Sequence, residues 1–121
     1  MPAHIVVVHD HPAFVDRVVT ALTTAGYDVA AFMSTMRAIE ALEAAQHIEV
    51  LITRVLFPMG QPNGAALARM ARMKRTGVKV LFTALPETQE HTVGVGEFLP
   101  APVVTSDIVE MVGKMLTEQD G

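Results

Sequence analysis

Val50-Leu-Ile-Thr-Arg-Val-Leu-Phe-Pro-Met-Gly-Gln-Pro-Asn-Gly64 is the stretch that decides the fold. It begins with a short, wholly apolar run, which is typical of a strand buried on both faces of a parallel sheet. The polar pair Thr53-Arg54 follows, and a loop with two prolines leads to Asn63, whose side chain is suited to cap a helix that opens at Gly64. Strand, loop and helix in this order place Arg54 at the carboxyl edge of a sheet, where open α/β folds carry their functional sites.

Strand and helix signals continue to alternate on both sides of this stretch. Apolar and β-branched runs predict strands at residues 4–8, 27–32, 50–53 and 78–82, with a short fifth strand near 97–99. Helical spacing and capping residues predict helices from Pro12 to about Ala25, from a Ser34 cap to about Gln46, from Gly64 to about Arg75, and from an N-cap within 105–107 to about 116. Only thirteen residues, 84–96, remain for the fourth crossover, which limits its helix to about two turns.

Five strand–helix units of this size predict an α/β protein with a three-layer, doubly wound, flavodoxin-like (βα)5 fold. Right-handed crossovers favour a parallel five-stranded sheet in the order 2-1-3-4-5, with a shortened fourth helix. This order puts the carboxyl ends of the first and third strands side by side. We therefore expect His9 and Asp10 to lie next to Thr53 and Arg54.

Length and composition narrow the classes of function. The 121 residues suit a single domain over 1–121, with a core at 4–116 and a polar tail at 117–121. The absence of cysteine excludes disulfide and thiolate chemistry and favours a cytoplasmic location, and no apolar run or leader predicts a membrane segment. A net charge of −4 argues against nucleic-acid binding. No glycine-rich phosphate motif and no nucleophile–base set is evident, so we expect no enzyme.

Four segments together form a further pattern, and they read Ile5-Val-Val-Val-His-Asp-His-Pro12, Val50 to Pro58, Phe82-Thr83-Ala84 and Phe98-Leu-Pro-Ala-Pro102. In these segments the chain resembles a receiver domain of a bacterial two-component response regulator, over residues 4 to about 116. The resemblance implies the flavodoxin-like fold predicted above. It also implies phosphorelay signalling, with protein contacts through the surface of the fourth helix, fifth strand and fifth helix.

Six positions correspond to the family's phosphorylation pocket, and they are His9, Asp10, Arg54, Thr83, Phe98 and Ala101. The family carries its phosphoacceptor aspartate four residues before a proline, and counting back from Pro58 lands on Arg54. His9 replaces the first acid of the family's acidic pair, and Ala101 stands where the family has a lysine. Thr83 and Phe98 keep the switch hydroxyl and the switch aromatic. The resemblance is therefore to a degenerate receiver, a pseudo-receiver, whose loop up to Gly64 looks two residues longer than usual.

The charge of this pocket leads to the same conclusion without the family. A magnesium site needs carboxylate or other oxygen ligands, and an acyl phosphate needs a carboxylate nucleophile. Asp10 and Arg54 sum to zero if His9 is neutral, and Arg54 is neither a nucleophile nor a metal ligand. We therefore expect no phosphorylation, no cofactor and no magnesium. We hypothesise that Arg54 pairs with Asp10 in place of a metal; the alternative is that Arg54 extends to solvent.

Three other sites are open to this sequence. Arg54 and Thr83 could together bind an anion or small molecule near a helix N-terminus, which makes a binding module of the same fold the alternative function. The spacing of His9 and His11 could bind zinc or copper, although no third ligand follows at a fixed offset. The third possibility is a phosphoacceptor at another position of the pocket, and Asp10 is the one carboxylate expected near the site.

Two surfaces are candidates for partners. The short fourth crossover exposes the sheet edge near the fifth strand, and exposed edges invite pairing. We therefore expect either a homodimer or a contact with a protein of a two-component pathway near residues 85–116. A basic cluster on the third helix fits either an acidic partner or an ordinary solvated face, and it comprises Arg69, Arg72, Lys74 and Arg75.

Overall fold

Strands and helices alternate along the whole chain in a computed structural model that describes residues 4–44, 47–57, 62–74 and 77–117. The elements are β1 (His4–Val8), α1 (Pro12–Thr24), β2 (Asp28–Phe32), α2 (Thr35–Ala44), β3 (Val50–Thr53), α3 (Gly64–Lys74), β4 (Lys79–Ala84), the 3-10 helix η1 (Pro86–Thr92), β5 (Glu97–Pro100) and α4 (Thr105–Thr117). Within these residues no helix has the length and apolarity needed to cross a bilayer.

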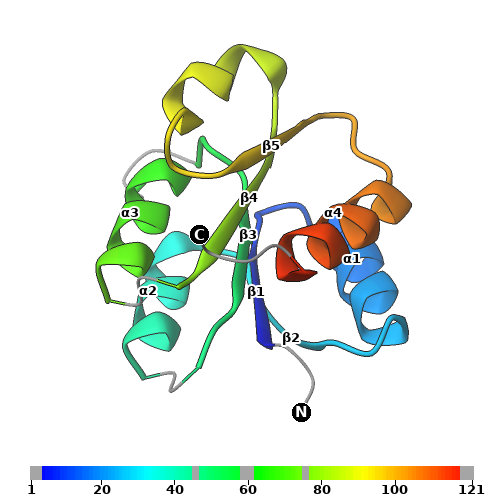
Figure 1. Cartoon of the computed structure of the whole chain (residues 1–121). Helices are drawn as coiled ribbons and strands as arrows, with labels where there is room; N and C mark the ends of the chain where they lie inside the picture. The colour runs from blue at the N-terminus through cyan, green and yellow to red at the C-terminus, as the bar shows by residue number, and fades with distance from the viewer. Residues whose placement is uncertain (1–3, 45–46, 58–61, 75–76, 118–121) are drawn as a thin grey trace.

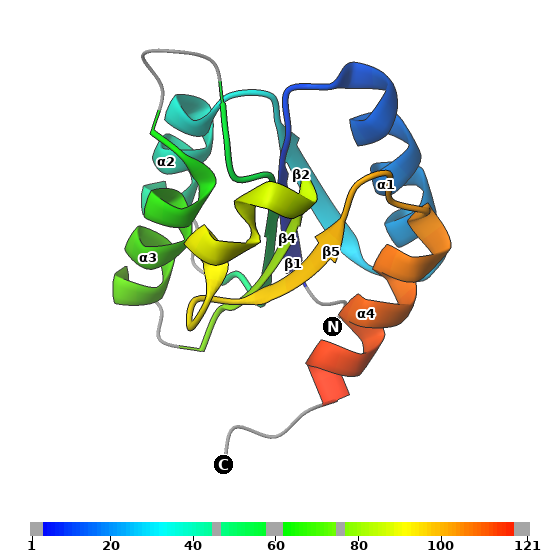
Figure 2. The same ribbon diagram turned by 90° about the horizontal axis from the view of Figure 1, so that it is seen from above.

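The five strands form one parallel sheet in the order β2-β1-β3-β4-β5, which confirms the predicted topology. Helices α1 and α4 cover one face of the sheet, and α2 and α3 cover the other (Figure 1). Seen from above, η1 and β5 close the end of the sheet that lies farthest from β2 (Figure 2). The fold is thus the three-layer, doubly wound, flavodoxin-like arrangement expected from the sequence.

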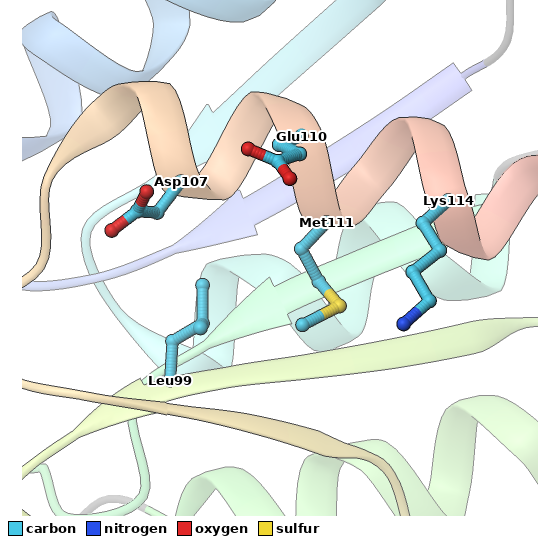
Figure 3. A pocket seen from close by; sticks show the side chains of 5 residues that line it. All are labelled: Leu99, Asp107, Glu110, Met111 and Lys114. Atoms are coloured by element: carbon cyan, nitrogen blue, oxygen red, sulfur yellow. The ribbon is translucent and has the colours of Figure 1, made fainter.

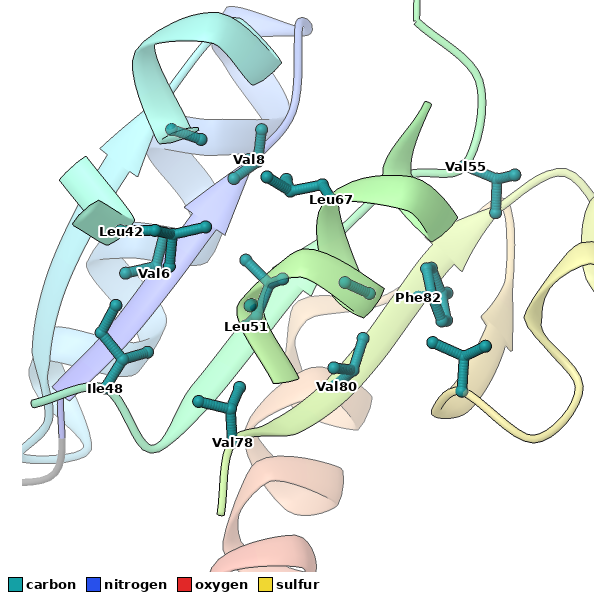
Figure 4. Close-up of a cluster of buried hydrophobic side chains, with 14 of the residues drawn as sticks. Val6, Val8, Leu42, Ile48, Leu51, Val55, Leu67, Val78, Val80 and Phe82 are labelled. Atoms are coloured by element: carbon teal, nitrogen blue, oxygen red, sulfur yellow. The ribbon is translucent and has the colours of Figure 1, made fainter. Parts of the chain in front are cut away.

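Alternating strand residues fill two separate cores. On the α2–α3 side, Val6, Leu51 and Phe82 pack against helix residues such as Leu42 and Leu67 (Figure 4). On the other side the strand residues Ile5, Val7, Ile52 and Leu81 pack against Val18 of α1 and Ile108 of α4. Successive strand residues point to opposite faces, so a sheet covered on both sides needs unbroken apolar strands. The apolar run at Val50 is the clearest case.

The predicted helix caps are largely confirmed. The Asn63 side-chain oxygen accepts a hydrogen bond from the Ala66 amide at 2.8 Å, and the Ser34 hydroxyl accepts one from the Arg37 amide at 3.2 Å. Gly26 follows the end of α1 with a φ of 99°, a conformation that favours glycine. At α4 the prediction was wrong in detail, because the helix already begins at Thr105 and residues 105–107 form its first turn.

Besides shifts of one residue at the starts of β2 and β4 and at the end of β5, the structure differs from the sequence prediction in three other places. The fourth crossover is a 3-10 helix rather than an α-helix, since thirteen residues must also return the chain to the sheet. Strand β4 continues to Ala84, because Thr83 and Ala84 pair with the end of β5. Thr117 belongs to α4 rather than to the tail. The predicted helix ends at Gln46 and Arg75, the length of the loop around 58–61 and the tail at 118–121 lie outside the described residues.

Candidate functional site

The carboxyl ends of β1 and β3 lie next to each other, as the strand order requires. Val8 pairs with Thr53, and the Arg54 amide still donates to the Val8 carbonyl at 3.4 Å. The Thr53 hydroxyl donates to the Arg54 carbonyl at 2.8 Å. A Cβ at Gly64 would stand 1.7 Å from that same carbonyl oxygen, so only glycine allows α3 to begin here. The backbone of Arg54 is therefore held by three neighbouring segments.

An ion pair joins the two strand ends. Arg54 Nη1 donates a hydrogen bond to Asp10 Oδ1, and each side chain is 25 % exposed. Burial raises the pKa of the Asp10 carboxyl, but the hydrogen bond and charge of Arg54 outweigh it and hold the pKa below its ordinary value. The hypothesised pair is confirmed, and the alternative of a guanidinium that extends freely into solvent is wrong. The pair is made through one nitrogen of Arg54 and one oxygen of Asp10.

His9 stands beside this pair as a neutral group. Its ring packs on Phe14 with the ring centroids 4.5 Å apart, and its Nδ1 accepts a hydrogen bond from the His11 amide at 3.3 Å. Burial, with the nearby charge of Arg54, lowers the pKa of His9 to about 4. At neutral pH the ring carries no charge, so Asp10 and Arg54 sum to zero as the sequence predicts.

Thr83 and Ala101 lie in a second, separate part of the crevice. Thr83 follows Leu81 on the face of β4 that is covered by α1 and α4, and the Ala101 amide donates to the Ala84 carbonyl at 2.7 Å. His9, Thr83 and Ala101 line one pocket of about 360 Å³ between α1 and the β5–α4 connection. Arg54 does not line it. The expectation that Arg54 and Thr83 act together on one anion is therefore not supported, since Arg54 is engaged by Asp10.

Phe98 is not brought to this pocket. It pairs with Phe82 in the β4–β5 register, shares its face of the sheet and packs half-buried against the α2–α3 core. Thr83, the next residue along β4, points to the opposite face. Five of the six predicted pocket residues thus gather at the carboxyl edge of β1, β3 and β4 and just beyond β5, and the sixth lies on the other face.

The residues present do not fit the magnesium ion that receiver domains use. Asp10 is the carboxylate at the crevice, and its Oδ1 is bound by Arg54. Across residues 4–44, 47–57, 62–74 and 77–117, no three histidine, aspartate or glutamate side chains gather as metal ligands. A divalent cation next to the Arg54 guanidinium would meet like charge. The His9–His11 pair is no better placed, because His9 Nδ1 already accepts the His11 amide.

Three pocket residues escaped the sequence reasoning: Phe14, Arg17 and Val103. The helical spacing of α1 assigns its apolar stripe correctly but gives no sign that its start lies beside the β5–α4 connection. That contact depends on how α1 and α4 sit over the same face of the sheet (Figure 2). The sequence does place a cation, Arg17, in the second turn of α1, but it does not show that this cation lies beside a pocket.

Comparison with known proteins identifies the fold. No protein-family model and no curated protein matches the sequence. Among solved structures, a response regulator receiver protein from Sinorhizobium medicae superposes with a TM-score of 0.88 at 23% identity, covering 98% of both chains. A CheY-like receiver domain protein from Methanospirillum hungatei gives 0.84 at 20% identity, covering 96% of this chain and 94% of that one.

A third solved structure is more similar in sequence. The receiver domain of the hybrid histidine kinase CckA gives a TM-score of 0.79 at 28% identity, covering 95% of this chain and 100% of that one. The chain therefore has the flavodoxin-like fold that these receiver domains have. The sequence resemblance and the structural comparison agree on this point over nearly the whole chain.

Proposed function

We propose that this chain is a signalling domain of a two-component response regulator that works without being phosphorylated. The observation that carries the proposal is the Arg54–Asp10 ion pair at the carboxyl ends of β1 and β3. It fills the position of a phosphoacceptor with a permanent cation and engages the remaining carboxylate. Neither residue is then available to hold a phosphoryl group or a magnesium ion.

The domain acts through protein contact rather than through catalysis. It is a single, non-enzymatic domain over residues 1–121, located in the cytoplasm and free of cofactor. Its output is contact with another protein, either a second copy of the chain or a member of a two-component pathway. The ion pair holds the crevice in one arrangement, so binding does not wait for a phosphoryl signal.

The surface of β5 and α4 is the contact surface we propose. A pocket of about 210 Å³ lies there, lined by Leu99, Asp107, Glu110, Met111 and Lys114. In Figure 3, Met111 extends from α4 toward β5, with charged side chains before and after it on the same helix. Apolar groups framed by charge are common in transient protein interfaces. Val104, the residue before α4, is a further exposed apolar side chain.

Intact-mass spectrometry after incubation with acetyl phosphate and Mg²⁺ tests the phosphorylation part of the proposal. The wild-type chain should gain no phosphoryl group. The matched control restores the acids and the lysine in one variant, His9→Asp with Arg54→Asp and Ala101→Lys, and should gain one if it folds. A phosphoryl adduct on the wild-type chain would refute the proposal.

Light scattering and a surface variant test the interaction part. Met111→Glu should abolish self-association or, if the chain is a monomer at high concentration, should abolish capture of its two-component partner. Met36→Glu is the matched control, because Met36 is 54% exposed on α2, which covers the opposite face of the sheet from α4. Equal loss in both variants, or no loss in either, would remove the β5–α4 surface from the account.

A further inference from the structure

The pocket beside Thr83 has no part in the signalling function proposed above. It lies between the start of α1 and the β5–α4 connection, which runs next to that helix (Figure 2). Its volume of about 360 Å³ falls within the range of small-molecule sites. The methyl side chain of Ala101 leaves this space open, where a longer side chain would reach into it.

Thr83 lines the pocket and carries an almost fully buried hydroxyl. Thr83 is 2% exposed, and its Oγ1 has no hydrogen-bond partner within the part of the chain that the structure describes. Two other buried threonines behave differently: the Thr88 and Thr92 hydroxyls each donate to a backbone carbonyl at 2.7 Å. A buried hydroxyl without a partner is unfavourable, and a ligand acceptor in the pocket would relieve it.

Charge at the pocket favours an anion. Arg17 lines it from α1, and among the described residues no carboxylate lies within 4.0 Å of the Arg17 guanidinium. None of the residues that line the pocket is acidic, although the chain as a whole carries a net charge of −4. The thirteen-residue helix α1 also begins here, at the His11 cap, and its N-terminus adds a partial positive charge.

The remaining walls are the rings of His9 and His11 and three apolar side chains. Phe14 comes from α1, and Pro102 and Val103 come from the β5–α4 connection. An inorganic anion would contact only the polar side of such a pocket. A ligand with an apolar group next to its charged head would fill both sides, which is the usual composition of small-molecule sites.

We propose that this pocket binds a small organic anion, a carboxylate or phosphate monoester with a compact apolar group. The Thr83 hydroxyl donates to the head group, and the Arg17 guanidinium neutralises it at the rim. The apolar group lies between Phe14 and Val103. This site uses neither Arg54 nor Asp10 and is independent of whether the domain is phosphorylated.

Amide NMR of the ¹⁵N-labelled full chain, titrated with benzoate and with phenyl phosphate, tests the proposal. Saturable shifts should centre on the amides of Phe14, Ala101 and Val103, with a Kd of about 1 mM for ligands of this size. Benzyl alcohol, which has the same ring and no charge, should give no saturation in this range. Whichever of benzoate and phenyl phosphate has the lower Kd shows whether the pocket prefers a carboxylate or a phosphate head group.

Paired variants separate the site from nonspecific binding. Thr83→Val removes the hydroxyl at nearly constant shape and should weaken binding about tenfold, whereas Thr83→Ser should restore it. Ala101→Leu should abolish binding by filling the pocket. Arg17→Gln should weaken binding about fivefold, and Arg37→Gln on α2, across the sheet, should leave it unchanged.

Three results would overturn the proposal. They are equal binding of benzyl alcohol and benzoate, shifts that do not saturate, and wild-type affinity in the Ala101→Leu variant with its fold intact by NMR.

Discussion

Two halves of one crevice, at the carboxyl edge of the sheet, differ in how their polar groups are paired. At the ends of β1 and β3, Arg54 has found a partner in Asp10, and the Thr53 hydroxyl is bonded to the Arg54 carbonyl. At the ends of β4 and β5, Thr83 keeps a buried hydroxyl that is unpartnered within the described residues, beside an open pocket at Ala101. The first half is filled by an ion pair, and the second holds a pocket beside a hydroxyl for which the described residues offer no partner.

The contrast shows that polar groups at one edge of a sheet can be paired at one place and left without a partner at another. A cation introduced next to a remaining acid closes its half of the crevice, because charge-assisted hydrogen bonds are among the strong ones in proteins. A short side chain at Ala101 does the reverse and leaves a pocket beside the buried Thr83 hydroxyl. Stability should therefore depend on the first half, and ligand binding on the second.

The largest effect is expected where α3 approaches Arg54. Gly64→Ala forces a Cβ onto the Arg54 carbonyl oxygen, 1.7 Å away, and should destabilise the protein by about 3 kcal/mol or prevent folding. Urea unfolding measures it. Gly77→Ala is the control, since its Cβ would meet nothing within 4 Å, and it should change stability by less than about 0.5 kcal/mol. Comparable losses in both variants would show that the close approach at Arg54 is not what matters.

Acid should lower the free energy of unfolding of the protein, because His9 in the filled half resists protonation in the folded state. Its pKa is lowered from 6.5 to about 4 in the folded protein, so the unfolded chain binds the extra proton between these values. The stabilisation is present above pH 6.5 and is lost as the pH falls toward 4. We expect the protonation of His9 alone to lower the free energy of unfolding of the protein by about 2 kcal/mol between pH 7 and pH 5.

Urea unfolding of wild type and His9→Gln at the two pH values isolates this contribution. The variant should lose most of the difference between pH 5 and pH 7. Below about pH 4 the lowered pKa of Asp10 adds a second loss, because its charge is favourable only in the folded state beside Arg54. An identical pH dependence in both proteins would contradict the neutral, buried His9.

Breaking the ion pair should have a smaller effect. Arg54→Met leaves Asp10 three-quarters buried without its cation, and should cost about 1–2 kcal/mol at neutral pH. The control is Lys74→Met, which removes the exposed Lys74–Glu43 pair at 4.0 Å and should cost about 0.5 kcal/mol or less. Chemical denaturation of both variants gives the comparison. A cost at Arg54 no greater than that at Lys74 would make the pair a surface contact only.

Two threonines at neighbouring strand ends give the smallest and most direct comparison of the halves. Thr53→Val removes a hydroxyl bonded to the Arg54 carbonyl and should destabilise by about 1 kcal/mol. Thr83→Val removes a buried hydroxyl without a partner in the described chain and should be neutral or stabilising by about 1 kcal/mol. Thermal unfolding of the pair should therefore give shifts of opposite sign. Shifts of the same sign would mean that the two hydroxyls are equally satisfied.

The sequence predicts the filled half of this crevice better than the open half. Arg54 and Asp10 follow two apolar strands that must be neighbours in the order 2-1-3-4-5, so their pairing can be predicted from topology and charge. The Thr83 pocket depends on how α1 lies over β4 and the β5–α4 connection, which no local pattern encodes. Phe98 was misplaced because its face is set by pairing with Phe82, a register that sequence alone does not give.

The fourth crossover shows the same limit at the level of an element. Its length excluded a long helix in advance, but the choice of a 3-10 helix over Pro86–Thr92 is made by the path back to β5. At Gly96 this path runs so close to β4 that a Cβ would stand 2.5 Å from the Val80 carbonyl oxygen. Such packing contacts arise from the tertiary structure and override local propensity.

Amide NMR with beryllofluoride and Mg²⁺, an acyl-phosphate mimic, tests most directly whether the Arg54–Asp10 pair has replaced the phosphorylation site. The account predicts no chemical-shift change at Asp10, Arg54 or Thr83 in the wild-type chain. It predicts changes at these positions in the His9→Asp, Arg54→Asp, Ala101→Lys variant, if that variant folds. Saturable shifts at Asp10 and Arg54 in the wild-type chain would contradict it.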